Sequence, residues 1–408
     1  MKYTDVFVPG GFPQYTYNPR TAIKLEEHLN EGKANLCKLI AITGQTKSGK
    51  TVVTKKVYPK DESVWIDGGS VKSEDDFWQQ IIDQLNYFQI SSESNTSEKQ
   101  GGSTLENNYS ATIAGLGGSK KYATSEQSQE SNTASHSKNL SSKVAAIKIL
   151  TKTRTPLIID DFHYISRDLQ GDIVRALKAP VFEGTPVIII AIPHKRYDAV
   201  KVEKEMTGRV SQVQVPNWRD EELLKIPEVG FKLLGIVVES EVTKSFIKEA
   251  IGSPHLMQEF CRSYCKELEK KESEEGIDIR SIYENIAEQI GKPIFEKLAK
   301  GPRQRADRMQ RRLKDGSKVD IYGLILKALA YLKPGLVSLE YEDLRHGIRE
   351  VAEPPAPQLH EVARVLKHMA TIAATDESSA PVIDFDEKEK KLHITDPFFS
   401  FYLKWGKI

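Results

Sequence analysis

Cysteine is scarce in this sequence, with three residues among 408. A disulfide framework normally uses an even number of closely spaced cysteines, so Cys37, Cys261 and Cys265 do not indicate one. Cys261 and Cys265 lie four positions apart on an expected helix, but they lack the histidine partners of a metal motif. We therefore expect three reduced thiols that carry no cross-link and no metal.

A surplus of one charge and a long apolar segment are also missing. Lys and Arg number 58 against 57 Asp and Glu, so no overall field draws the protein to nucleic acid or to a membrane, although a local patch still could. No apolar run approaches the roughly 20 residues of a membrane-spanning helix. The first residues, MKYTDVFVPGG, do not read as a signal peptide. These absences predict a soluble, cytoplasmic protein without a membrane partner.

One short stretch carries specific chemistry, because residues 44–51 have the pattern G-x-x-x-x-G-K-T of a phosphate-binding P-loop. A strand-like run at 36–43 precedes it and a helix-compatible run at 51–57 follows, which is the order that the motif requires. Lys50 would reach the β- and γ-phosphates, and the Thr51 hydroxyl would ligate Mg²⁺. We expect a nucleoside triphosphate to bind through the whole loop: Gly44, Gln45, Thr46, Lys47, Ser48, Gly49, Lys50 and Thr51.

A second apolar run, at 157–161, ends in two carboxylates, Asp160 and Asp161. Acids at the end of a buried strand are what a Mg²⁺–phosphate site needs beside a P-loop. Asp160 is expected to hold Mg²⁺, largely through water, and Asp161 to polarise the attacking water. The pair therefore predicts hydrolysis of ATP or GTP.

Further strand-like runs at 63–67, 187–192 and 209–215 alternate with helical segments. The alternation predicts an α/β fold, a P-loop NTPase core at 36–217 whose parallel sheet is flanked by helices. Residues 1–35 precede this core. They form either a structural cap or a segment that closes over the nucleotide base.

An insert at 91–142 interrupts the core, and 27 of its 52 residues are Ser, Gly, Asn or Gln. So little apolar material predicts disorder as the default. The alternative is a glycine-turned hairpin at 109–122 that is ordered by a neighbouring subunit or a ligand.

The remaining residues are mostly helical in pattern, with a lid at 218–300, a basic connector at 301–317 and a winged-helix domain at 318–408. In the connector, residues 303–314 hold six Arg or Lys against one Asp, which fits a solvated linker or a phosphate-binding strip.

The last domain has three expected helices, at 321–332, 339–351 and 359–373. A hairpin with strands at 382–386 and 392–395 follows them, and an aromatic helix begins at Pro397. Three helices and a two-stranded wing describe a winged helix, which contacts either duplex DNA or protein. Its third helix exposes Arg364, Lys367 and His368.

With these motifs in place, the chain resembles the AAA+ and STAND branch of P-loop ATPases. Within that branch it is similar to archaeal and bacterial ATPases related to origin-recognition initiators and to signalling STAND proteins. The resemblance covers nearly all of the chain except residues 91–142. It implies further site residues: His194 as the sensor, Arg209 as an arginine finger acting on a neighbouring subunit, Gly252 and Pro254 as the lid motif near the base, and Pro19 with Arg20 as the entry motif.

Some residues depart from the AAA+ pattern. Asp161 stands where AAA+ motors usually carry Glu, and the shorter side chain predicts slow turnover. His194 replaces the usual Asn or Thr, and the sequence has no recognisable helicase motif or substrate-threading pore loop.

The resemblance implies an ATP-binding, slowly ATP-hydrolysing, Mg²⁺-dependent oligomeric switch. Its nucleotide state would control self-assembly and the recruitment or activation of a partner protein, as in bacterial anti-phage defence. The alternative is a DNA-binding ATPase, similar to replication initiators or transposition regulators. Such a protein would load or mark duplex DNA through the winged helix and residues 303–314.

Overall fold

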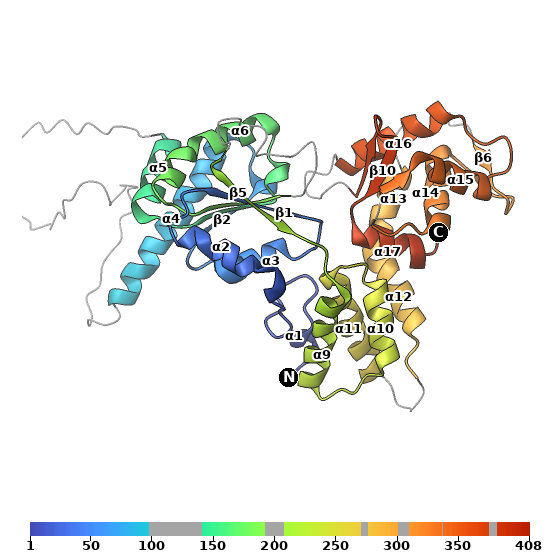
Figure 1. Cartoon of the computed structure of the whole chain (residues 1–408), viewed down its shortest axis with the longest axis horizontal. Helices are drawn as coiled ribbons and strands as arrows, with labels where there is room; N and C mark the ends of the chain where they lie inside the picture. The colour runs from blue at the N-terminus through green and yellow to red at the C-terminus, as the bar shows by residue number, and fades with distance from the viewer. Residues whose placement is uncertain (98–140, 192–207, 271–275, 301–309, 337, 375–381) are drawn as a thin grey trace, which may run out of the picture.

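The structure is a computed structural model of the whole chain. It describes residues 1–97, 141–191, 208–270, 276–300, 310–336, 338–374 and 382–408, with the backbone alone for 86–97. Figure 1 shows three regions: a sheet covered by helices, a helical region beside it, and a C-terminal region of helices and short strands. Within the described residues, no helix is long and apolar enough to cross a membrane.

The first region is built on a five-stranded sheet in the order β2-β3-β4-β1-β5, with every neighbouring pair parallel. Its strands are β1 Leu39–Gly44, β2 Val64–Asp67, β3 Leu157–Asp160, β4 Val187–Ala191 and β5 Val210–Val215. The central strands are almost wholly buried and apolar, as a parallel sheet covered on both faces requires. The predicted α/β fold, a P-loop NTPase core with a parallel sheet flanked by helices, is confirmed.

Alternate residues of β1 face two separate cores. Leu39 and Ala41 pack with one set of helices, and Ile40 and Ile42 with the other. The first set is α4 Glu74–Ser97, α5 Ser142–Thr153, α6 Arg167–Ala176 and α7 Lys178–Phe182; the second is α2 Leu25–Lys33 and α3 Lys50–Val57. Short 3₁₀ turns η1, η2 and η3 lie at Thr21–Ile23, Gly68–Ser70 and Phe162–Tyr164.

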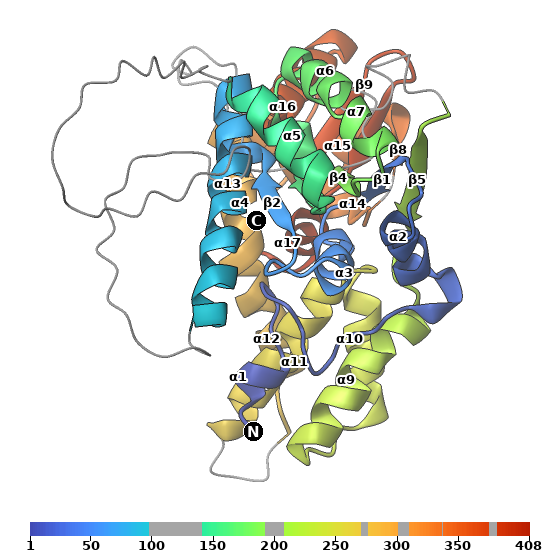
Figure 2. The same ribbon diagram turned by 90° about the vertical axis from the view of Figure 1, so that its left-hand side faces the viewer.

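The insert differs from its sequence expectation at its start. Helix α4 continues to Ser97, so residues 91–97 are helical, whereas their composition predicted disorder from residue 91. In Figure 2, α5 lies beside α4 on the same face of the sheet. The hairpin proposed at 109–122 lies outside the described residues, as do all residues from 98 to 140.

The helical region, called the lid below, follows β5. It consists of α9 Asp220–Leu234, α10 Ser240–Glu249, α11 Pro254–Glu269, α12 Ile279–Ile286, the π-helical turn η5 Ala287–Gly291 and α13 Lys292–Lys300. The N-terminal α1 Tyr3–Val6 packs on it rather than on the sheet. The Phe7 ring lies edge-on to Phe231 with centroids 5.2 Å apart, and a Cβ at Gly230 would come within 2.3 Å of that ring. The first part of the segment 1–35 is thus attached to the lid, and α2 together with Ile23 of η1 packs on the sheet.

The described residues include all three cysteines. All three are free thiols, and Cys261 and Cys265 are buried in the lid core. Burial raises the pKa of both buried thiols, so neither is activated as a thiolate. The described residues also contain no group of three or more His, Cys, Asp or Glu side chains arranged to hold a metal ion.

The C-terminal region contains β6 Arg311–Arg312, β7 Lys318–Val319, α14 Ile321–Leu332, β8 Ser338–Glu340, α15 Tyr341–Val351, α16 Leu359–Ala374, β9 Ile383–Asp386, β10 Lys391–Ile394 and α17 Pro397–Trp405. The hairpin β9–β10 gains β8 as a third antiparallel strand, which the sequence analysis did not predict. The helices lie close to their expected positions. That these elements act as a winged helix stays a prediction.

Helix α17 joins the C-terminal region to the lid. Phe399 belongs to the core of the C-terminal region, whereas Phe401 and Tyr402 belong to the lid core. A Cβ at Gly291 would lie 2.4 Å from the Cβ of Tyr402, so glycine is needed for this close approach. The Lys404 ammonium also pairs with Glu249 of α10 at 2.7 Å. These contacts pack the middle and the end of α17 between the C-terminal region and the lid.

Candidate nucleotide-binding site

The P-loop connects β1 to α3 at the carboxyl end of the sheet, in the predicted strand–loop–helix order. Gly49 ends the loop with φ of 93°, a conformation that strains any residue with a side chain. Helix α3 begins directly afterwards at Lys50, so the unpaired N–H groups of its first turn face the loop. Such an arrangement is suited to an anion.

The Lys50 side chain is buried inside the loop, with the residue only 7% exposed. Its Nζ donates to the carbonyl oxygens of Gly44 and Gln45 at 2.8 and 2.7 Å. Burial lowers the pKa of Lys50 to about 8, against the opposing effect of the Asp161 and Asp160 charges. At neutral pH the buried ammonium therefore stays mainly charged.

Two hydroxyls of the loop are buried without a hydrogen-bond partner among the described residues. They are Thr46 Oγ1 and Ser48 Oγ. An unsatisfied buried hydroxyl costs about 1–3 kcal/mol, and phosphate oxygens in the loop could accept from both. The residues present therefore fit a polyphosphate.

The acidic end of β3 meets α3 as predicted. Asp160 Oδ1 accepts from Thr51 Oγ1 at 3.2 Å and from the Asp161 N–H at 3.0 Å. Burial raises the pKa of Asp160, although the hydrogen bond from Thr51 opposes this shift. A carboxylate and a hydroxyl this close are ligands suited to Mg²⁺, which prefers oxygen and uses few protein groups beside substrate phosphates.

Asp161 follows with φ of 49°, in the left-handed region. Burial, together with the charges of Asp160 and Asp67, raises its pKa to about 6, against the opposing effect of the Lys50 charge. A Cβ at Gly68 would lie 2.4 Å from the Asp161 carbonyl oxygen, so the turn after β2 must be glycine for Asp161 to sit there.

Asp67 was missed by the sequence analysis. It ends β2 in register with Asp160 on β3, and its charge acts on both neighbouring acids. The available signal was the strand-like run at 63–67, which ends in an acid as the run at 157–161 does.

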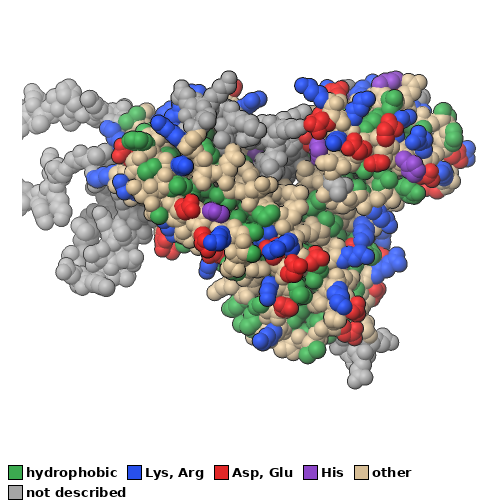
Figure 3. Space-filling view, in the orientation of Figure 1, with side chains coloured by type: hydrophobic (Ala, Val, Ile, Leu, Met, Phe, Trp, Pro, Cys, Tyr) green, Lys and Arg blue, Asp and Glu red, His purple; other side chains and the backbone are tan. Residues whose placement is uncertain are grey.

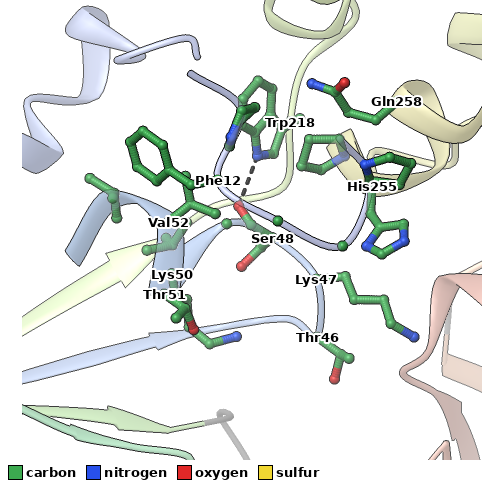
Figure 4. A pocket seen from close by; sticks show the side chains of 18 of the residues that line it. Phe12, Thr46, Lys47, Ser48, Lys50, Thr51, Val52, Trp218, His255 and Gln258 are labelled. Atoms are coloured by element: carbon green, nitrogen blue, oxygen red, sulfur yellow. Dashed lines mark hydrogen bonds between the residues drawn. The ribbon is translucent and has the colours of Figure 1, made fainter. Parts of the chain in front are cut away.

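A cavity of about 580 Å³ lies over the loop. Figure 4 shows the P-loop side chains on one side of it and Trp218, His255 and Gln258 on the other. The sequence analysis assigned no role to several residues that line it: Phe12, Tyr17, Trp218, His255, Gln258 and Asp396. The cavity therefore has walls from the N-terminal segment, the lid and the C-terminal region.

Trp218 joins the loop to the start of the lid. Its indole Nε1–H donates to the Ser48 carbonyl oxygen at 2.8 Å, as the dashed line in Figure 4 shows. Nearby, Gln258 of α11 donates to Thr16 Oγ1 at 2.7 Å and accepts from the Val8 N–H at 3.2 Å. These contacts hold the N-terminal segment against the lid at the cavity wall.

Arg20 lines the cavity, but its guanidinium is engaged with the lid connection. It donates to the carbonyl oxygens of Pro216 and Asn217 at 3.0 Å each and to Glu222 Oε2 at 2.8 Å. The hydrogen bond from Arg20 lowers the pKa of Glu222 against the opposing effect of burial. Arg20 thus positions the connection between β5 and α9, and its contact with nucleotide stays a prediction.

The other residues implied by the resemblance fall in different places. Pro254 begins α11 and lines the cavity, and Gly252 precedes it with φ of 69°. His194 lies outside the described residues.

Arg209 is exposed and comes directly before β5. In the parallel register Val210 lies beside Leu39, and Val215 beside Gly44. Five residue steps separate these pairs, which is roughly 17 Å along a strand. Arg209 is therefore at the opposite end of the sheet from the P-loop of its own chain.

A scan against protein-family models and a search of curated proteins found no match. Among solved structures, the chain is similar to a Walker-type ATPase of Pyrococcus abyssi, with a TM-score of 0.51 and 15% identity over 93% of this chain and 94% of that one. The ORC2 protein of Aeropyrum pernix in its ADP form has a TM-score of 0.47 and 12% identity over 97% and 94% of the two chains. The ORC1 protein of the same organism in complex with DNA has a TM-score of 0.46 and 12% identity over 98% and 96%. Together with the parallel sheet and its P-loop, the likeness to the Pyrococcus abyssi structure shows that this chain has the fold of a Walker-type P-loop ATPase.

Proposed function

We propose that this protein binds ATP with Mg²⁺ at the P-loop and hydrolyses it slowly. The observation that carries the proposal is the 3.2 Å contact between Thr51 of the loop and Asp160, 109 positions away, beside the buried Lys50 ammonium. Two strand ends and a helix start supply the groups of a Mg²⁺–phosphate site from distant parts of the sequence.

Each residue of the site has a separate role in this proposal. Lys50, which donates to carbonyl oxygens of its own loop, would bind the β- and γ-phosphates, and the first N–H groups of α3 would bind the same phosphates. Thr51 and Asp160 would hold Mg²⁺, which would supply positive charge beside the phosphates. Asp161 is ionised at neutral pH and accepts a hydrogen bond from the attacking water. Because Asp is one methylene shorter than Glu, it positions this water less firmly, and turnover is slow.

The second part of the proposal is that hydrolysis requires a neighbouring subunit. Arg209 is exposed at the far end of the sheet from its own P-loop, and β5 is at one end of the strand order. Both facts support a guanidinium that reaches the phosphates of an adjacent copy. Nucleotide state would then control assembly, and assembly would recruit or activate a partner protein in the cytoplasm. Bacterial anti-phage defence, the setting that we favour, rests on the family resemblance alone.

Mixing two inactive variants tests this assignment. Arg209→Ala and Asp161→Asn should each bind ATP and hydrolyse it at least about 1,000-fold more slowly, the lower range for a lost arginine finger. A mixed oligomer contains interfaces in which Arg209 of one subunit meets Asp161 of the other, so ATPase activity should partly return and rise with protein concentration. Activity that stays at the level of the single variants, in oligomers shown to be mixed, would rule out a finger acting between subunits.

Duplex DNA is the second candidate partner. Arg364, Lys367 and His368 are exposed on α16, which favours it, although Lys367 pairs with Glu387 at 3.1 Å. Several basic residues of the strip 303–314 are instead paired with acids of the C-terminal region: Arg311 with Glu361, Arg312 with Glu353 and Lys314 with Glu350. On the face in Figure 3, basic and acidic side chains are interspersed over this region. We therefore rank DNA binding below the switch.

A duplex-DNA binding assay at several salt concentrations distinguishes the DNA-loading function from the nucleotide-driven switch. A protein that grips duplex DNA through phosphates loses affinity steeply as salt rises. Binding that is undetectable at about 50 mM salt would exclude the DNA-loading function. Tight, strongly salt-dependent binding would favour the DNA-loading function over the switch.

A further inference from the structure

Lys47 belongs to the P-loop but pairs with the C-terminal region. Its Nζ lies 2.8 Å from Asp396 Oδ2, and the two residues are 349 positions apart. The Asp396 side chain is 9% exposed and that of Lys47 is 24% exposed, so the pair is shielded from solvent more than an ordinary surface ion pair. In Figure 4 the Lys47 side chain points away from the loop, toward the ribbon of the C-terminal region.

A second group of α17 contacts the same ammonium. Lys47 Nζ lies 3.2 Å from the centroid of the Phe398 ring, a cation–π contact. Asp396 in turn uses its other oxygen as the N-cap of α17, accepting from the Phe398 and Phe399 N–H groups at 2.8 and 2.9 Å. The start of α17 is thus tied directly to the loop that would hold the phosphates.

The two lysines of the loop differ in a way that matters for phosphate binding. Lys50 donates to carbonyl oxygens of its own loop, so its departure toward a phosphate frees nothing outside the loop. Lys47 has φ of 61° and holds a carboxylate of another region. A polyphosphate in the loop would attract the Lys47 ammonium and repel the Asp396 carboxylate, since both residues line the same cavity.

We propose that Lys47 couples occupancy of the P-loop to the docking of α17. In the empty loop, the ammonium binds Asp396 and Phe398 and holds the C-terminal region against the core. A bound polyphosphate takes over the ammonium, and the start of α17 is released. This inference rests on the proposed nucleotide binding at the same loop. It assigns to the pair a regulatory role that catalysis does not need.

The coupling is reciprocal, because two linked equilibria must shift each other equally. Any change that breaks the pair in the empty protein should therefore raise the affinity for nucleotide. Asp396→Asn is suited to this test, since asparagine is a good N-cap and can keep the cap of α17, while it removes the charge that Lys47 holds. We expect the full-length variant to bind a fluorescent ATP analogue about 5- to 20-fold more tightly than the wild type, within the usual range of allosteric coupling.

Amide hydrogen exchange of α17 gives a second readout that does not depend on hydrolysis. In the wild type, exchange at residues 397–405 should become faster when ATP is added with Mg²⁺. In Asp396→Asn it should already be fast without nucleotide and change little on addition. Phe398→Leu, which keeps apolar packing and removes the ring, should shift affinity in the same direction by about 2- to 5-fold.

Two controls separate the pair from general effects of charge and of Lys47 itself. Glu340→Gln removes the same charge from the C-terminal region, at a pair with Lys391 (3.3 Å) that does not line the cavity; its affinity should match the wild type. Lys47→Met breaks the pair and also removes the ammonium that phosphate would attract, so affinity should not rise. Exchange of α17 in this variant should no longer respond to ATP.

The outcomes distinguish this inference from the proposed function. A wild type that does not bind the ATP analogue would overturn both. Normal binding with no nucleotide effect on α17 exchange, and with Asp396→Asn equal to the wild type, would overturn the coupling and leave the ATP site intact. An increase in affinity that Glu340→Gln shares would also overturn it, because charge alone would then explain the effect.

Discussion

The two sides of the nucleotide cavity are built in different ways. The floor consists of the P-loop, the start of α3 and Asp161 after β3, whose groups are placed by backbone hydrogen bonds of a sheet and a helix. The cover consists of residues 8–20, the start of the lid and the start of α17, which side-chain contacts such as Arg20–Glu222 and Lys47–Asp396 hold together. In the proposed function the residues of the floor bind the phosphates, and the residues of the cover respond to that binding.

This difference predicts two kinds of variant. A change in the floor should remove binding or catalysis while the rest of the molecule stays folded. A change in the cover should shift affinity, stability or motion by smaller amounts, because each contact there is one of several. The following changes test that contrast.

The largest effect is expected from Lys50→Ala. The side chain contacts its own loop and would bind phosphates through charge-assisted hydrogen bonds worth about 1.5–3 kcal/mol each. The loss of these hydrogen bonds should weaken ATP binding at least roughly 100-fold. Equilibrium titration with a fluorescent ATP analogue measures this, and the circular dichroism spectrum should stay native.

Lys60→Ala is the matched control, since Lys60 is an exposed lysine shortly after the same helix and does not line the cavity. It should bind ATP as the wild type does. Unchanged affinity in Lys50→Ala would contradict the assignment of the floor.

The floor was also the part that the sequence could predict. A strand, a glycine loop and a helix are neighbours along the chain, and Asp160 with Asp161 follows an apolar run of its own. The parallel sheet follows from such runs alternating with helices, and the fold was confirmed in this form. A sequence pattern is enough to predict the P-loop and the two acids, because residues that are close in sequence hold these groups in place.

The cover could not be predicted in the same way. Ser48 meets Trp218 across 170 positions and Lys47 meets Asp396 across 349, and no periodicity links such pairs. The family resemblance places Arg20 at the site, but no sequence pattern indicates that Glu222 would bind its guanidinium. Similarly, the composition of residues 91–142 was averaged over the whole segment, which hid the helical turns up to Ser97.

The second largest effect is expected from Gly291→Ala, which should destabilise the packing of α17 on the lid. A Cβ at this position would lie 2.4 Å from Tyr402 Cβ and 2.8 Å from the Phe398 carbonyl oxygen, so α17 must move. Overpacking of this kind costs about 1–3 kcal/mol. We expect a lower free energy of unfolding in urea and faster amide exchange in α17, with ATP binding retained.

Gly276→Ala provides the comparison, because a Cβ there has no described atom within 4 Å. Its unfolding free energy should stay within about 0.5 kcal/mol of the wild type. Equal stability of the two alanine variants would show that α17 does not depend on the close approach at Gly291.

A smaller effect is expected from Trp218→Phe. The variant loses the 2.8 Å hydrogen bond to the Ser48 carbonyl oxygen but keeps an aromatic ring beside the loop. A net hydrogen bond is worth about 0.5–1.5 kcal/mol, so ATP affinity should fall roughly 2- to 12-fold. Trp65→Phe removes an indole donor that binds Tyr58 and Ser63 outside the cavity, and its affinity should not change. A similar loss in both variants would mean that Trp218 acts only through stability.

The smallest effect is expected from replacing residues 98–140, and the geometry of α4 and α5 decides how this must be done. Ser142 contacts Asp75, and Lys143 Nζ lies 2.6 Å from Glu74 Oε1, so α5 begins beside the start of α4. The chain must therefore return about 35 Å from Ser97, the length of the 24-residue helix. At no more than about 3.6 Å per residue, a linker needs at least roughly ten residues.

A Gly/Ser linker of about 16 residues should thus leave ATP binding unchanged and shift the unfolding free energy by less than about 1 kcal/mol, as expected for a change in loop length alone. A linker of about six residues cannot span the distance and should pull α5 away from α4, which lowers stability sharply. Urea denaturation and ATP titration of both variants measure this. If the longer linker weakens ATP binding at unchanged stability, residues 98–140 contribute to the cover. If it abolishes only oligomers, they contact a neighbouring subunit, because the nucleotide site within one chain would still be complete.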